Sequence, residues 1–215
     1  MLERTTYFQK CLRRLKQDVL RMGALVEDSF RLSHQCLFAG KLELAQEFQS
    51  REKRIDQYYR QIEEECTTIL TLQAPVAKEL RILSAYMQLV RDLERIGDYA
   101  QNLTEMAVKL FNYPPHPCMK EIEEMSDFAQ GMLRKSLKAL GELDGTAGET
   151  IKHLDDEVDN AYTRIYQTLA QQRNIQGAVE PILLLALAIR DLERMADHAT
   201  NIAQRVSYIV NGHRD

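Results

Sequence analysis

The sequence predicts an all-α protein built from two tandem, pseudo-symmetric three-helix bundles. Three features support this prediction. Helix-forming residues dominate the 215-residue chain, which contains only 9 glycines and 5 prolines. Three of the prolines lie near the midpoint, in Pro114-Pro115-His116-Pro117, where a helix cannot continue. A motif also recurs on both sides of this break, which indicates that the second half duplicates the first.

Each half is expected to contain three helical segments. In the first half they cover residues 5–39, 41–71 and 75–111. In the second half they cover residues 119–143, 149–171 and 179–210. Gly40, Gln73-Ala74-Pro75, Gly145 with Gly148, and Asn174 to Gly177 separate them, and such short connections predict antiparallel neighbours. We therefore expect a first repeat at 1–112, a proline-rich linker at 113–118 and a second repeat at 119–215.

The duplicated motif lies in the third segment of each half. Residues 91–103 (RDLERIGDYAQNL) align with residues 190–202 (RDLERMADHATNI), and 8 of the 13 pairs are identical at an offset of 99. A weaker match joins Glu52-x-x-x-Asp56 to Asp155-x-x-x-Asp159 at an offset of 103. The difference of four residues corresponds to a change in one loop.

Acidic residues at these duplicated positions form the candidate functional site. In the third segment, apolar residues recur at steps of three and four, which is typical of a helix seam and turns the intervening acids away from the core. If the second and third helices are antiparallel, the two acidic pairs of each half meet. The candidate residues are Glu52, Asp56, Glu94 and Asp98 in the first half, and Asp155, Asp159, Glu193 and Asp197 in the second.

Two interpretations of these acids remain open. Four carboxylates on one surface form an all-oxygen site suited to hard cations such as Mg²⁺, Mn²⁺ or Fe³⁺. Alternatively, flanking residues such as Arg95 and Arg194 neutralise them, and the acids belong to a solvated, ion-paired surface. Asn102 and Asn201 lie one turn further on and either add an amide oxygen to each site or are simply polar surface residues.

Charge and cysteine usage narrow the class of protein. The formal charge of −4 argues against nucleic acid as a partner, because phosphate recognition normally requires a basic excess. Four scattered cysteines without a C-x-x-C pair favour free thiols in the cytoplasm. The longest apolar run, Ile182 to Ile189, is too short to span a bilayer. Phosphate-loop, dinucleotide-binding and nucleophile-elbow motifs are missing, so we expect a protein that is not an enzyme.

The doubled R-D-L-E-R-[IM]-[GA]-D-x-A-x-N motif, the upstream acidic pairs and the segment Gln73 to Arg81 together resemble the PhoU family of bacterial phosphate-signalling regulators. The resemblance covers nearly the whole chain. It implies one multinuclear metal cluster per bundle, held by the eight acids named above, with iron, zinc, manganese or magnesium as the metal. Asp156 and Glu157 offer alternative ligands beside Asp155, and Lys53 and Arg54 follow Glu52 and could weaken the first site.

The same resemblance implies a cytoplasmic, homodimeric regulatory adaptor. Members of this family restrain phosphate uptake and the phosphate-starvation response, and link a phosphate ABC transporter, through its ATPase subunit, to a membrane-bound sensor histidine kinase. Contact with the membrane is then expected only through these partners. Two alternatives come from the residues alone: a metal-dependent phosphohydrolase or metal-storage bundle that uses the carboxylates, and a purely structural helical protein.

Overall fold

The computed structural model describes residues 2–76, 78–173 and 177–212, with side chains from residue 7 onward. Over these ranges it contains α-helices and one 3₁₀ helix and no strands, which confirms the all-α prediction. The elements are α1 (Leu2–Ala39), η1 (Leu42–Glu47), α2 (Phe48–Gln73), α3 (Lys78–Leu110), α4 (Met119–Glu142), α5 (Gly148–Ala170) and α6 (Glu180–Asn211). The expected loop at residues 174–177 lies largely outside the described residues.

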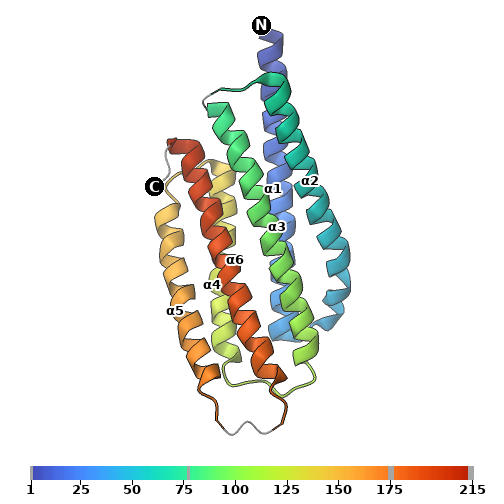
Figure 1. Cartoon of the computed structure of the whole chain (residues 1–215), viewed down its shortest axis with the longest axis vertical. Coiled ribbons are helices and arrows are strands. Elements are labelled where there is room, and N and C mark those ends of the chain that lie inside the picture. Colours follow the sequence, from blue (N-terminus) through green and yellow to red (C-terminus); the bar gives the residue numbers. More distant parts are fainter. Residues whose placement is uncertain (1, 77, 174–176, 213–215) are drawn as a thin grey trace.

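The helices form two three-helix units that lie side by side (Figure 1). Helices α1, α2 and α3 pack against one another, and so do α4, α5 and α6. The two units meet along α3 and α6 on one face and along α1 and α4 on the other, with α2 and α5 at the outer edges (Figure 1). The prediction of two pseudo-symmetric bundles is therefore confirmed, but their buried residues form one continuous core.

The predicted apolar stripes occupy the centre of this core. In α6 all eight stripe residues, from Leu185 to Ile209, are buried. In α3 the corresponding stripe is buried from Tyr86 to Ala107, and Leu110 packs against its edge. Both helices also bury a second row of residues, because each contacts three or more neighbouring helices. This second row is Leu83, Val90, Gly97 and Thr104 in α3, and Ile189, Ala196 and Ala203 in α6.

One predicted element is wrong in part. The segment 41–71 was expected to be one helix, but residues 42–47 form the 3₁₀ helix η1, and α2 begins at Phe48. Gly40 ends α1 with a φ of 65°, and Lys41 gives η1 no side-chain cap. The tighter turn packs Leu42 and Leu44 against the core before the chain reverses into α2.

The structure also answers two questions raised by the sequence, about membrane spans and about the cysteines. Within the described ranges, none of them is long and apolar enough to cross a membrane. Cys11, Cys36, Cys66 and Cys118 are all described, and none takes part in a disulfide.

Candidate functional site

The first acidic cluster lies where α2 crosses α3. Glu52 and Asp98 line the same shallow cavity of about 280 Å³. Asp56 lies close enough to raise the pKa of both Glu94 and Asp98 through charge repulsion, although burial is the larger cause of both shifts. The antiparallel packing of α2 and α3 thus brings together the acids that the sequence placed on two separate helices.

The second acidic cluster repeats this arrangement between α5 and α6. The pKa of Asp159 is raised by burial and then by the nearby charges of Asp155 and Asp197. Burial also raises the pKa of Glu193, and Asp197, Asp159 and Asp155 add to the shift. Each repeat therefore holds carboxylates whose mutual repulsion would be relieved by protons or by a cation.

The second cluster also distinguishes between the alternative acids on α5. The Asp155 side chain is only 10% exposed and lies on the buried seam with Ile151 and Val158, whereas Asp156 and Glu157 are exposed. Lys152 Nζ lies 3.0 Å from Asp155 Oδ2 and 3.3 Å from Asp156 Oδ1. Asp155 is therefore the acid of this group that faces α6.

The seam pattern predicted that the acids of the third helices turn away from the core; none of them is buried in the core, but they are only partly exposed. The Glu94 side chain is 19% exposed and that of Asp98 is 36% exposed, because α2 covers this side of α3. Glu193 is 25% exposed and lies in the same position against α5. A helix with several packed neighbours has no fully free side, so its flanking positions lie at the border of a second interface.

Arginines pair with the acids in both clusters. Arg95 lies 3.4 Å from Glu94 and 3.3 Å from Asp98, and its counterpart Arg194 lies 3.6 Å from Glu193 and 3.3 Å from Asp197. In this arrangement, the described residues contain no three His, Cys, Asp or Glu side chains already directed at one metal position. The donor set suits a hard cation, and the arginine pairs are what such a cation would have to displace.

The two asparagines considered as additional ligands bond across the boundary between the repeats. Asn102 Nδ2 donates to Asp191 Oδ2 at 3.2 Å, and Asn201 Nδ2 lies 3.5 Å from Asp92 Oδ1. This reciprocal pairing between α3 and α6 follows the pseudo-symmetry of the duplicated motif. Tyr99 and His198, which are also counterparts, stack between these pairs with ring centroids 6.0 Å apart.

Asp92 and Asp191 are buried residues that the sequence interpretation overlooked. Asp92 accepts a hydrogen bond from Arg205 Nε at 2.8 Å and lies 2.9 Å from His198 Nδ1. Burial raises the pKa of Asp191, and Asn102 and Arg190 offset part of that shift. Their positions could have been recognised, because each is an identical acid of the duplicated motif immediately before a seam leucine.

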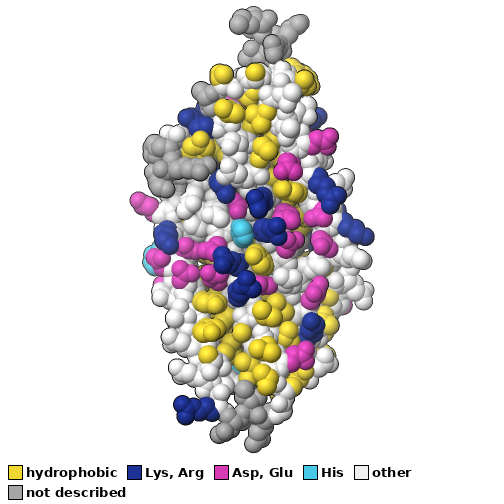
Figure 2. Space-filling view, in the orientation of Figure 1, with side chains coloured by type: hydrophobic (Ala, Val, Ile, Leu, Met, Phe, Trp, Pro, Cys, Tyr) yellow, Lys and Arg dark blue, Asp and Glu magenta, His cyan; other side chains and the backbone are white. Residues whose placement is uncertain are grey.

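These groups form a charged belt across the face made by α3 and α6. Figure 2 shows acidic and basic side chains crossing the middle of this face, with apolar side chains above and below. Among the apolar residues at the start of α6 are Leu183 and Leu187, both substantially exposed. The belt combines the arginines of both acidic clusters with the network around Asp92.

The fold and these clusters define a class of helical proteins in which two tandem domains each carry an acidic motif at equivalent positions. The PhoU domain matches this chain twice, at residues 19–107 and 122–206. The chain therefore belongs to the PhoU family.

Relatives agree with this assignment over almost the full length. The chain is 65% identical over 210 residues to a phosphate-specific transport system accessory protein PhoU homolog from Synechocystis, covering 98% of this chain and 94% of that protein. The crystal structure of PhoU from Pseudomonas aeruginosa has a TM-score of 0.89 and 31% identity, covering 96% of this chain and all of that chain. The regulatory protein PhoU from Streptococcus pneumoniae, at 24% identity, has the same fold with a TM-score of 0.87 over 97% of this chain and 99% of that chain.

Proposed function

We propose that this chain regulates phosphate transport as a cytoplasmic, metal-binding adaptor. It restrains phosphate uptake and the phosphate-starvation response by linking a phosphate ABC transporter to a sensor histidine kinase, without catalysing a reaction itself. The relatives named as phosphate-specific transport system accessory proteins support the transport role. The proposal also includes the adaptor role, the link to the kinase, the homodimer and the bound metal.

The observation that carries the metal proposal is the repetition of one acidic cluster in both halves. Each repeat gathers four acids from two packed helices, and in each cluster two of them have a raised pKa. Carboxylates that repel one another at a helix interface are unfavourable unless a proton or a cation offsets their charge, and both halves keep this arrangement. Glu52, Asp56, Glu94 and Asp98 would hold one group of ions, and Asp155, Asp159, Glu193 and Asp197 the other.

The direct test is elemental analysis of untagged protein purified without chelator or added metal. We expect two or more ions of iron, zinc, manganese or magnesium per chain, and loss of about half of them in Asp98→Ala and about half in Asp197→Ala. Asp127→Ala, in an exposed acid of α4, is the matched control and should retain all of the metal. Fewer than about one tenth of an ion per wild-type chain would refute the metal proposal.

The arginine pairs provide a second test. A cation must displace Arg95 from the first cluster and Arg194 from the second. Arg95→Gln and Arg194→Gln should therefore lower the Kd for Mn²⁺ at the corresponding cluster about threefold, a modest change because these pairs are partly exposed. Titration calorimetry on chelator-treated protein measures this effect. An unchanged or raised Kd would mean that the arginines do not compete with the metal.

The adaptor role requires contact with two partners. Purified chain should retain the transporter ATPase subunit and the cytoplasmic part of the kinase in pull-down assays, with retention that differs between high and low phosphate. Light scattering on the eluted protein should give the mass of a homodimer. The adaptor role would be refuted if the chain retained neither partner at high or at low phosphate. That result would leave the metal proposal unaffected.

A further inference from the structure

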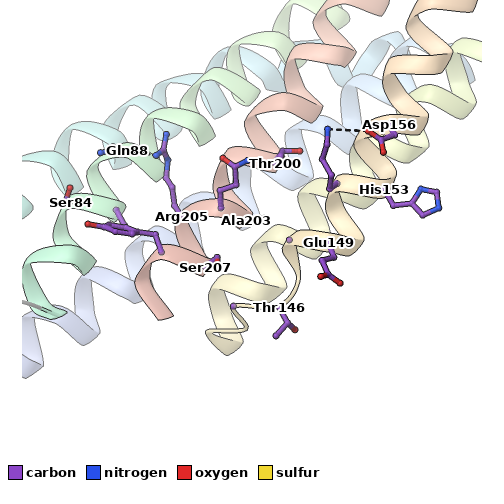
Figure 3. Close-up of a pocket in the computed structure, with 16 residues that line it drawn as sticks. Ser84, Gln88, Thr146, Glu149, His153, Asp156, Thr200, Ala203, Arg205 and Ser207 are labelled. Atoms are coloured by element: carbon purple, nitrogen blue, oxygen red, sulfur yellow. Dashed lines mark hydrogen bonds and ion pairs between the residues drawn. The ribbon is translucent and has the colours of Figure 1, made fainter. Parts of the chain in front are cut away.

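A groove of about 1050 Å³ lies between α3, α6 and the beginning of α5, where the first repeat meets the second (Figure 3). Its volume is in the range of sites that bind small molecules, and such sites are frequent where two structural units meet. None of the eight carboxylates of the two acidic clusters lines it. The groove therefore lies beside the second acidic cluster, to which Lys152 of its lining is linked by an ion pair with Asp155.

Arg205 supplies a fixed positive charge on one wall. Its Nε donates to Asp92, and its Nη1 donates to Gln88 of α3, which Figure 3 places beside it. In the described structure its Nη2 makes no hydrogen bond, and the side chain remains 24% exposed. A guanidinium held in this way retains donors for an oxyanion without having to be ordered on binding.

Thr200 supplies an unused hydrogen-bonding group on the same helix. Its Oγ1 is buried and finds no partner among the described residues, although Thr200 lines the groove. A buried hydroxyl without a partner is unfavourable for the folded protein. Ala203, which lies between Thr200 and Arg205 along α6, has a small side chain that leaves the space beside them open.

Lys152 supplies a movable positive charge on the opposite wall. Its ammonium pairs with Asp155 and Asp156 on its own helix, and its side chain is 60% exposed. Exposed pairs within a helix are weak, so the flexible lysine can turn to an anion in the groove. Glu149 and His153 also line the groove, but Figure 3 shows their side chains directed away from α6.

From these groups we propose that the groove binds a small molecule that carries an oxyanion, either a free anion or an anionic ester. Arg205 and Lys152 attract the anion from opposite walls, and rotation of the Thr200 side chain brings its hydroxyl, which is buried in the free protein, to donate a hydrogen bond to it. The ring of Tyr208 provides apolar surface in the remaining lining and accommodates the uncharged part of an ester.

The pseudo-symmetry limits the site to one per chain. At the equivalent positions of the other repeat, Arg205 is replaced by Met106, Thr200 by Gln101 and Gln88 by Leu187. Leu187 is exposed there, so the matching surface is apolar. Binding should therefore saturate at one molecule per chain.

Titration calorimetry on chelator-treated protein tests this site with three probes: adenosine 5′-monophosphate, inorganic phosphate and adenosine. We expect the nucleotide to bind one per chain with a Kd below about 1 mM, and adenosine to bind at least tenfold more weakly because it lacks the oxyanion. Binding of inorganic phosphate at the same site would identify a free anion as sufficient, whereas binding of the nucleotide alone would identify an ester. Either result supports the proposal.

Variants locate the site. Lys152→Met and Thr200→Val should each raise the Kd about fivefold to tenfold, since each removes one group that contacts the anion. Neither change should unfold the protein, because Lys152 is exposed and the Thr200 hydroxyl has no bond to lose. Lys120→Met, in an exposed lysine of α4, is the control for lost charge and should leave the Kd unchanged.

Three results would overturn the proposal: no binding by the nucleotide or phosphate, equal binding of adenosine and the nucleotide, or binding that Lys152→Met and Thr200→Val do not weaken. Because the titration uses metal-free protein, failure here says nothing against metal binding at the acidic clusters. Conversely, protein that binds no metal can still bind the oxyanion.

Discussion

The two halves of the molecule bury an aspartate at the same place in the duplicated motif but surround it differently. Asp92 of α3 is bonded to Arg205 and lies beside His198, both on α6. In the first repeat, the positions equivalent to His198 and Arg205 are occupied by Tyr99 and Met106, and the one hydrogen bond of Asp191 in the described structure comes from Asn102. Burial consequently raises the pKa of Asp191.

This difference shows how a duplicated fold acquires two distinct surfaces. The helix arrangement and the apolar character of the seam are shared, while residues on the facing helix decide the charge and polarity of each end. Arg205 of the second repeat corresponds to Met106 of the first, and Gln88 of the first corresponds to Leu187 of the second. The end of the face that carries Arg205 and Gln88 has the polar groove. One end of the α3–α6 face is therefore suited to a small polar ligand and the other is apolar.

The strongest way to break the difference is to remove from Asp92 the guanidinium partner that Asp191 lacks. In Arg205→Met, Asp92 remains buried without its guanidinium partner, and we expect the free energy of unfolding to fall by about 3 kcal/mol. Urea denaturation followed by circular dichroism measures the change. Arg134→Met removes a different arginine, from an exposed pair with Glu27, and should change stability by less than about 0.5 kcal/mol. Equal losses in the two variants would contradict this explanation.

A smaller change is expected from His198→Tyr, which gives α6 the residue that α3 has at position 99. The contact between His198 Nδ1 and Asp92 is lost, while an aromatic ring still stacks on Tyr99. We expect a loss of about 1 kcal/mol in the free energy of unfolding, the usual contribution of one such hydrogen bond. The free energy lost through His198→Tyr should be different in the Arg205→Met variant from that in wild type, because both residues contact the same carboxylate. Full additivity would show that they act independently.

The smallest effect, and one of opposite sign, is expected from Asp191→Asn. The raised pKa means that folded Asp191 binds a proton more tightly than the unfolded chain does, so its charge destabilises the fold at neutral pH. Asparagine keeps an oxygen for Asn102, and the variant should be as stable as wild type at pH 7 or up to about 1 kcal/mol more stable. Asp92→Asn should instead be destabilising, because Arg205 loses its charged partner.

The same variant makes a prediction about pH. As the pH falls from 7 toward the raised pKa, protonation of Asp191 stabilises the folded wild type, whereas the asparagine has no proton to gain. The advantage of Asp191→Asn over wild type should therefore shrink as the pH is lowered. Denaturation curves at pH 7, 6 and 5 measure it, and an advantage that grows on acidification would show that the Asp191 pKa is not raised.

The parts of the structure that follow local rules were predictable from the sequence. The repeat, the helices and the seams from Tyr86 and Leu185 onward follow from periodicity and from the 99-residue offset. The two acidic clusters follow from antiparallel packing of helices joined by short connections. Residues 42–47 departed from prediction because helix propensity says nothing about how a chain reverses after Gly40.

What was not predictable depends on contacts between the halves. The apolar pattern of one helix indicates only one buried side. It could therefore not show that α2 covers Glu94 or that α6 buries Asp92. The groove beside Arg205 also arises only when α3, α5 and α6 are brought together. Comparison of the two repeats offered the best available signal, since Arg205 and Met106 differ in charge at matched positions.

The continuous core has a consequence for how the chain is made. The partners of α3 on α6 lie about a hundred residues later, so at ordinary rates of synthesis they leave the ribosome roughly 5–20 seconds after α3 does. During that interval the side of α3 that packs against α6 is uncovered, and Asp92 lacks its partner Arg205. We therefore expect the nascent first half to be more prone to aggregation than the finished chain.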